Sequence, residues 1–265
     1  MERRVRIDLA YDGTSYAGWQ VQPGLPTIQG ALEEALSRIH GGVPVRARGA
    51  GRTDAGAHAR GQVADAIITT RADDGALLAS LSSLLPVDIR PRRVLTVDPG
   101  FDARQRAVEK TYRYLVDTSP QGDPWLARFA LASAGRLDDR AIDDALARLP
   151  GRRDWSGFTA AACEIADRVR MMTGARRAIL RPGLAAFYFT ADGFMTHMVR
   201  NIVGTLLEIG RGRFEPERVD EILESGDRAR GGATAPAKGL ALLRVVYDGA
   251  FGGDSGDAED EGALW

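Results

Sequence analysis

The chain has few of the residues that build disulfide or metal frameworks. Its 265 residues include one cysteine, Cys163, and three histidines, His40, His58 and His197, which are scattered singly. One cysteine excludes an intrachain disulfide and any zinc site that needs a cysteine pair. The scattered histidines make a three-histidine metal site a poor prediction. We therefore expect no metal.

Long apolar runs are also missing. The sequence contains no stretch of about 18 or more apolar residues, which excludes a predicted membrane span. Residues 1–8 are charged and contain no apolar core of the kind that a secretory signal needs. The hydrophobic content of 44% is ordinary for a soluble folded protein. We expect a cytoplasmic protein.

Lysine is scarce, and the net charge is small. Of 35 basic residues only Lys110 and Lys238 are lysines, and the formal net charge is −1. Residues 250–265 carry several acidic groups and no Lys or Arg, so the rest of the chain is mildly basic. Any nucleic-acid site must therefore be a local patch. The acidic, glycine-rich tail itself is predicted to be disordered.

Hydrophobic periodicity predicts an α+β fold. Strands are expected at 3–11, 43–49, 62–69, 87–97, 108–116, 169–180, 184–190 and 240–247. Helices are expected at 28–39, from Asp73 or Asp74, at 138–149, at 194–209 and from Pro216. In the first strand, alternation places Val5, Ile7 and Leu9 on one face, and Arg4, Arg6 and Asp8 on the other. This pattern predicts a half-buried strand.

Residues 49–61 place Asp54 among four glycines and between Arg52 and Arg60. Glycines disfavour regular structure and permit a tight loop whose backbone lies close to a ligand. A nearby cation favours the ionised form of a carboxylate. The alternative is a surface turn with a structural Asp–Arg pair.

The expected helix at 194–209 contains a cation within an apolar pattern. His197, Arg200 and Gly204 are expected to share one flank of it. A glycine inside a helix costs about 1 kcal/mol relative to alanine, so Gly204 suggests a closely approaching backbone or ligand. Arg200 either extends along its own stem to solvent or pairs with a buried carboxylate, for which Asp54 is the candidate.

Two further segments offer candidate binding residues. Lys110 and Tyr112 share one face of the expected strand at 108–116. Tyr112 is either a core residue or a ring that stacks on a flipped base. The loop at 235–240 is either a simple turn or brings Leu240 to the floor of a base pocket. We expect Lys110 and Leu240 to contact the substrate.

Four blocks of the sequence resemble the tRNA pseudouridine synthase A family: 51–59, 101–114, 197–204 and 235–240. The resemblance extends over about residues 3–248. It implies that Asp54 is the nucleophile, that Tyr112 stacks on the target uracil and that Arg200 pairs with Asp54. By the same resemblance, Arg52 helps to extrude the nucleotide. The substrate would be uridine at tRNA positions 38, 39 and 40.

The resemblance also implies an architecture. The pseudouridine synthase fold has two ferredoxin-like αβ halves that share a mostly antiparallel central sheet with helices packed on it. The halves would be residues 1–104, which carry the catalytic loop, and 105–249, followed by the tail 250–265. A homodimer would bind the anticodon arm across both subunits. The chain departs from the family at Asp102 (usually His) and at Ala241 (usually aromatic), and 152–158 matches loosely.

One carboxylate suits this isomerisation. The uracil must leave the sugar, rotate and rejoin through C5, which a covalent intermediate permits without metal or cofactor. Whether Asp54 attacks the base or the sugar stays open. A glycoside hydrolase would need a second carboxylate nearby, and Asp65 is the nearest acid along the chain. A non-catalytic RNA-binding module would tolerate the loss of Asp54.

Overall fold

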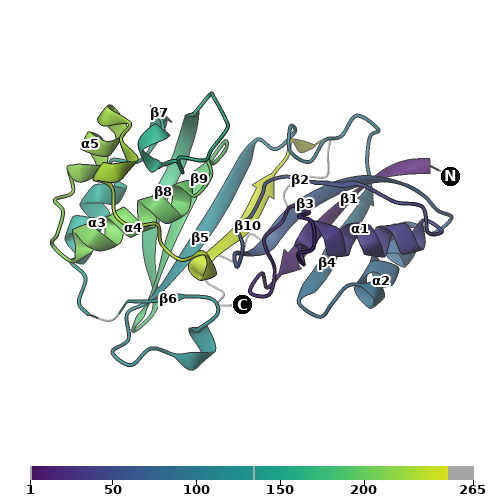
Figure 1. Ribbon diagram of the computed structural model, residues 1–265, viewed down its shortest axis with the longest axis horizontal. Helices are drawn as coiled ribbons and strands as arrows, with labels where there is room; N and C mark the ends of the chain where they lie inside the picture. The colour runs from purple at the N-terminus through teal and green to yellow at the C-terminus, as the bar shows by residue number, and fades with distance from the viewer. Residues whose placement is uncertain (1, 134, 250–265) are drawn as a thin grey trace. The chain divides into compact units, whose positions relative to one another are not determined.

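The computed structural model describes residues 2–133 and 135–249, and the predicted acidic tail at 250–265 lies outside this part. The chain forms two compact units (Figure 1). The first contains residues 2–108 together with 241–249, and the second contains 109–240. The expected division at 104/105 assigned the last strand to the second half, whereas the structure groups this strand with the first unit.

The first unit is a mostly antiparallel sheet with two helices. Its strands pair in the order β4-β1-β3-β10, with β2 also on β3, and only the β3–β10 pair is parallel. The elements are β1 (Glu2–Tyr11), α1 (Ile28–Ile39), β2 (Ala47–Gly49), β3 (His58–Thr69), α2 (Asp74–Leu84), β4 (Ile89–Thr96) and β10 (Leu240–Val246). In Figure 1, α1 and α2 lie side by side against this sheet.

Local sequence explains the helix starts and the irregular edge strand. Thr27 caps α1 by accepting a hydrogen bond from the Gly30 amide, and Asp73 caps α2. β4 lies at the end of the strand order. Its register with β1 shifts beside Pro91. A proline is tolerated there because it removes no ladder bond from the interior of the sheet.

The prediction that β1 is half-buried was wrong. Arg6 is fully buried and Asp8 is 4% exposed, because both faces of the strand are covered. Arg6 Nε donates to Asp8 Oδ1 over 2.8 Å, and Arg93 donates to Asp8 Oδ2 over 2.7 Å. The Arg6 guanidinium also lies 4.7 Å from the ring centre of Tyr247, which follows β10. Polar and apolar residues alternate along β1 in the same way whether the polar face is exposed or covered. The alternation therefore could not reveal that Arg6 and Asp8 are buried.

The second unit has an antiparallel sheet in the order β5-β9-β8-β7, with β6 parallel to β5. Its strands are β5 (Glu109–Asp117), β6 (Leu131–Ala132), β7 (Gly151–Asp154), β8 (Val169–Arg181) and β9 (Leu184–Ala191). Its α-helices are α3 (Asp139–Leu146), α4 (Met198–Gly210) and α5 (Arg218–Ser225). Its short 3-10 turns are η1 (Pro124–Leu126), η2 (Ser156–Phe158), η3 (Arg228–Arg230) and η4 (Ala237–Gly239).

The predicted β8–β9 hairpin is confirmed, and it turns at Pro182 and Gly183. Gly183 has a φ of +81°, which glycine adopts at no steric cost. α3 packs against α4 and β8, and α4 packs against β5 (Figure 1). The two units together make this an α+β protein, as the periodicity predicted, and its strands pair mostly antiparallel, as the resemblance implied.

Two predicted boundaries were wrong. α4 begins at Met198, not at Phe194, because His197 precedes it with a left-handed backbone (φ 61°, ψ 5°). His197 therefore does not share a helical flank with Arg200. β3 begins at His58, so residues 58–61 belong to the strand and not to the preceding loop.

Candidate active site

The Asp54 loop, residues 50–57, connects β2 to β3 and is held by the loop at 12–19. The Trp19 amide donates to Thr53 O over 3.0 Å, and the Gly56 amide donates to Tyr16 O over 3.2 Å. Within the loop, the Ala57 amide donates to Asp54 O over 3.0 Å. The backbone on both sides of Asp54 is therefore tied down although the segment has no regular structure.

Glycine is required where these loops meet. A Cβ on Gly13 would lie 1.9 Å from Ala57 O, and one on Gly18 would lie 2.7 Å from Thr53 O. Gly18 also has a φ of +95°. The two loops thus approach more closely than side chains would allow, and this contact fixes the path of the main chain around Asp54.

A buried polar cluster supports the loop from the strands. The Tyr11 hydroxyl lies 2.8 Å from Thr53 Oγ1, and Gln62 Nε2 donates to Gly51 O over 2.9 Å and to the Tyr11 hydroxyl over 3.3 Å. Burial raises the pKa of Tyr11 to about 12, against weaker lowering by the bonds to Thr53 and Gln62. The phenol is therefore neutral at physiological pH, and it anchors Thr53, the residue before Asp54.

His58 joins the other end of the loop to residues 12–14. Its Nδ1 accepts a hydrogen bond from the Gly13 amide over 3.1 Å and lies 3.2 Å from Asp12 Oδ1. His58 is 5% exposed. His58, the first residue of β3, therefore ties this end of the Asp54 loop to the loop at 12–19.

Asp54 itself is half-buried, and Arg52 is exposed. Both belong to the first unit. The Asp54 carboxylate is thus partly accessible, as a nucleophile must be, and it stands on a main chain that hydrogen bonds hold in place.

In the second unit, β5 carries two of the predicted site residues. Lys110 pairs in register with Ala191 of β9, and Tyr112 with Phe189. Tyr112 is 7% exposed, and its ring meets that of Phe194 edge to face, with centroids 4.9 Å apart. Phe194 thereby sets the orientation of the Tyr112 ring.

Arg200 lies in the first turn of α4 and bonds to the segment at 231–236. Its Nε donates to Ala235 O over 2.7 Å, and the Ala235 amide donates back to Arg200 O over 3.1 Å. Arg200 is thus held at Nε by a main-chain carbonyl of this segment, and its pairing with Asp54 stays a prediction.

The same segment runs over β5 on its way to Leu240. The Tyr114 hydroxyl donates to Pro236 O over 2.7 Å, and a Cβ on Gly239 would lie 2.6 Å from the Tyr114 ring. Burial raises the pKa of Tyr114 although the charge of Arg200 opposes this. Leu240 is 6% exposed. The second unit therefore connects Arg200, Tyr114 and the loop that ends at Leu240.

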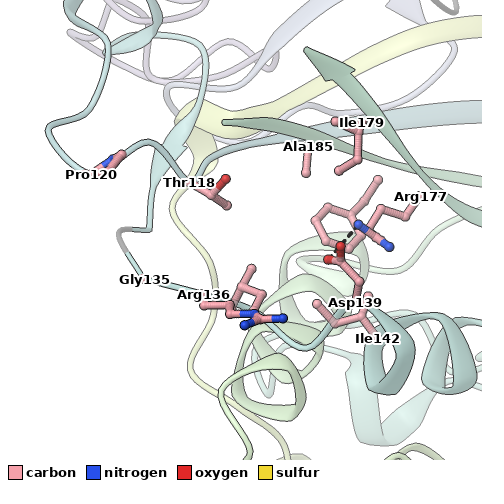
Figure 2. A pocket seen from close by; sticks show the side chains of 11 residues that line it. Thr118, Pro120, Gly135, Arg136, Asp139, Ile142, Arg177, Ile179 and Ala185 are labelled. Carbon is pink, nitrogen blue, oxygen red and sulfur yellow. Dashed lines mark hydrogen bonds and ion pairs between the residues drawn. The ribbon is translucent and has the colours of Figure 1, made fainter. Parts of the chain in front are cut away.

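A separate cavity of about 520 Å³ lies in the second unit, between α3 and the β8–β9 hairpin (Figure 2). Arg177 and Ile142 line it, and Arg177 donates to Asp139 over 2.8 Å and to Asp143 over 3.1 Å. None of the predicted site residues lines this cavity. We therefore do not include it in the candidate site.

The described residues, 2–133 and 135–249, contain neither a metal-binding cluster nor a membrane-spanning helix. No cluster of three or more His, Cys, Asp or Glu side chains there could hold a metal ion. No helix there combines the length and the apolar character needed to cross a membrane.

Sequence reasoning missed the residues that hold the candidates in place. Tyr11, Thr53 and Gln62 form the support beneath the Asp54 loop, and Tyr114 and Asn201 anchor the segment that Arg200 contacts. Asn201 could have been identified from the sequence. It stands within the apolar pattern of α4, and a buried amide there must have hydrogen-bond partners.

These features define an α+β protein that presents an aspartate on a rigid glycine-rich loop. The family model described as tRNA pseudouridine synthase matches residues 145–248. Three similar proteins, each called tRNA pseudouridine synthase A, match nearly the whole chain. The one from Geobacillus kaustophilus is 41% identical (94% of this chain, 96% of the relative), that from Streptococcus mutans 38% (92% and 99%) and that from Moorella thermoacetica 42% (92% and 99%). The chain therefore belongs to the tRNA pseudouridine synthase A family.

Proposed function

We propose that this chain is an isomerase that converts uridine to pseudouridine in the anticodon stem-loop of tRNA, at positions 38, 39 and 40. One observation carries the proposal: relatives named tRNA pseudouridine synthase A are 38–42% identical to this chain over more than nine-tenths of its length. The Asp54 loop supports it, because hydrogen bonds hold its main chain and leave the carboxylate partly accessible to a substrate.

In the proposed reaction, the bond between C1′ and N1 breaks, the uracil turns, and a bond forms between C1′ and C5. The proton on C5 is lost and N1 gains one, so atoms and electrons balance and no redox cofactor is needed. Asp54 is the nucleophile that holds one fragment covalently while the base turns. Enclosure of the flipped nucleotide excludes water that would otherwise divert the intermediate to hydrolysis.

The remaining predicted residues take supporting roles. Tyr112 stacks on the target uracil, Arg200 pairs with Asp54, and Arg52 helps to extrude the nucleotide. Lys110 and Leu240 contact the substrate. The orientation of Tyr112 by Phe194 and of Arg200 by Ala235 supports these assignments, because each side chain is held before any substrate arrives.

For the whole protein we infer the architecture of the family. Along the sequence, residues 1–104 and 105–249 would be two ferredoxin-like halves that share a central sheet, with β10 of the second stretch completing the first half, followed by the tail at 250–265. A cytoplasmic homodimer would bind the anticodon arm of tRNA across both subunits. The antiparallel pairing within each unit and the helices packed on it support the proposed fold, and the homodimer follows from the family resemblance alone.

The test is pseudouridine formation by the purified protein on an unmodified tRNA transcript. Asp54→Asn keeps the size of the side chain and removes its charge, so the rate should fall by at least about a thousandfold. The affinity for tRNA should change little, because Arg52, Lys110 and Tyr112 remain. Pseudouridine is quantified by nucleoside mass spectrometry, and affinity by filter binding.

Asp73→Asn is the matched control. It removes a carboxylate from the same unit but keeps a good helix cap, so it should leave the rate unchanged. An Asp54→Asn protein that retains the wild-type rate would remove the assignment of the nucleophile. Release of free uracil, with an abasic site left in the tRNA, would instead indicate a glycosidase.

A further inference from the structure

The main chain of α4 touches the segment at 231–236. A Cβ on Gly204 would lie 1.8 Å from Ala233 O, and a Cβ on Gly232 would lie 2.5 Å from Gly204 O. Such distances are incompatible with any side chain. The predicted close approach at Gly204 is thus confirmed, and the approaching group is another stretch of this chain.

Hydrogen bonds hold the 231–236 segment against α4 at two points along the helix. The Gly232 amide donates to Thr205 Oγ1 over 3.0 Å. Farther along, the Ala235 amide donates to Arg200 O, and Arg200 Nε donates to Ala235 O. The second pair sets the plane of the Arg200 guanidinium, because Nε is part of that plane.

Asn201 lies between these two points and is 1% exposed. Its Nδ2 donates to Phe158 O over 2.7 Å, and its Oδ1 accepts from Thr234 Oγ1 over 2.7 Å and from Arg228 Nη2 over 3.0 Å. Arg228 Nη2 also lies 2.7 Å from Gly232 O and 3.2 Å from Thr234 Oγ1. Asn201 therefore joins η2, η3 and the 231–236 segment to α4.

The acceptors around Arg228 Nη2 are neutral oxygens, and burial lowers the pKa of this guanidinium. Other arginines of the unit pair with carboxylates, as Arg177 does with Asp139 and Arg211 with Glu208. Arg228 is half-buried, so its guanidinium keeps part of its hydration while Nη2 holds Asn201, Gly232 and Thr234 together.

We propose that Asn201, Arg228 and Thr234 are positioning residues, which fix the direction of the Arg200 guanidinium through the 231–236 segment. This inference rests on the proposed function, in which Arg200 pairs with the reacting carboxylate. Ala235 accepts the Nε bond of Arg200, and the position of Ala235 is set by Thr234, the residue before it. Loosening that segment frees the guanidinium to rotate, while Arg52, Lys110 and Tyr112 lie on other elements and stay in place.

Thr234→Val tests the proposal, because Thr234 is exposed and the substitution removes little besides the hydroxyl bond. The single-turnover rate of pseudouridine formation should fall about tenfold, as a small misplacement of a reacting group allows. The dissociation constant for tRNA should stay within about twofold. Thr234→Ser keeps a hydroxyl and should restore the rate. Thr173→Val removes a hydroxyl bond on β8 and should behave as wild type.

A double-mutant cycle shows whether the effect passes through Arg200. If it does, Thr234→Val should add nothing to Arg200→Met, because groups that act as a unit are not additive. A full additional tenfold loss in the double variant would overturn the proposal. So would a Thr234→Val protein with the wild-type rate, or one that only binds tRNA more weakly.

A readout independent of activity separates this inference from the proposed function. The Arg200 Nε–H resonance, assigned by its absence in Arg200→Lys, should exchange with solvent slowly in the wild type. It should exchange faster in Thr234→Val and in Asn201→Leu. Unchanged exchange in both variants would refute the positioning role, whatever the activity. An inactive wild type would refute the proposed function instead.

Discussion

At the scale of single residues, a buried phenol determines how firmly the Asp54 loop is held. Tyr11 lies in β1, far along the chain from the loop, and its hydroxyl bonds to the side chain of Thr53. Because burial raises the pKa of Tyr11 to about 12, the group keeps its proton throughout the physiological range. A charged phenolate at this place would lose its solvation, so the loop depends on the neutral form.

The stability of the protein in alkali tests this. The pKa of Tyr11 in the folded state, about 12, lies above its ordinary value of 10.0. Its contribution is therefore fully present below about pH 10 and is lost as the pH rises toward about 12. As the pH rises through this window, the free energy of unfolding should fall less steeply in Tyr11→Phe than in the wild type. The two slopes should differ by up to about 1.4 kcal/mol per pH unit.

Urea unfolding of both proteins across this alkaline window measures the two slopes. Tyr11→Phe should also be less stable near neutrality by about 1–2 kcal/mol, because it loses hydrogen bonds to Thr53 and Gln62. This offset is constant with pH and does not affect the comparison of slopes. Parallel curves for the two proteins would contradict the burial of a protonated phenol.

Residue chemistry near Asp54 was predictable only in part. The glycines around it indicated a tight loop, and the structure has one. The partners Tyr11 and Gln62 were not identified, because alternation in a strand reports a face and not a contact. Which hydroxyl meets Thr53 depends on the pairing of β1 with β3, and its register shifts between Leu9 and Tyr11. No local pattern encodes that shift.

At the scale of elements, α4 shows what periodicity can and cannot predict. The apolar stripe predicted a buried helix, and Gly204 predicted a close neighbour. The start of the helix was misplaced because His197 adopts a left-handed conformation, which is uncommon for a residue with a side chain. The pattern of Met195 and Met198 suits a helix, but the backbone at His197 interrupts it.

The contact at Gly204 predicts a difference between two identical substitutions. Gly204→Ala should destabilise the protein by about 1–3 kcal/mol, because the new methyl group overlaps Ala233 O and backbone must shift. Gly75→Ala in α2 meets nothing closer than 3.6 Å and should stabilise the protein by up to about 1 kcal/mol.

Thermal or urea unfolding of the two alanine variants provides the measurement, and each serves as the control of the other. The intrinsic preference of alanine for helices favours both substitutions, more strongly in the interior of α4 than in the first turn of α2. Equal stabilisation by both would show that α4 and the 231–236 segment are not in contact. Equal destabilisation would show that the effect is not specific to Gly204.

At the scale of the whole molecule, the first unit is discontinuous in sequence. β10 pairs in parallel with β3, at Ala241 opposite His58, directly after the Asp54 loop. The Tyr247 hydroxyl donates to Ala103 O over 2.6 Å, across 144 residues of sequence. The sequence predicted the strand β10 itself. It did not predict that β10 groups with the first unit, because periodicity does not report which distant strands pair.

A chain ending at residue 239 tests the importance of this last strand. Without β10 and Tyr247, β3 loses its parallel partner, and Arg6 loses the ring that covers it. Amide exchange in β3 should become at least about tenfold faster, and unfolding should lose cooperativity. Tyr247→Phe removes only one hydroxyl bond and should keep a cooperative transition. Unchanged protection of β3 in the shortened chain would contradict this account.

The meeting of Gly204 with Gly232 has a consequence for how such a chain can evolve. At most packing contacts, a larger side chain on one residue can be compensated by a smaller side chain on its neighbour. Two such substitutions together allow the sequence to change during evolution. Here both partners already have the smallest side chain that exists, so neither can shrink to rescue the other. Divergence at this point is open only to variants that move the 231–236 segment itself, and with it the arginine that the segment holds.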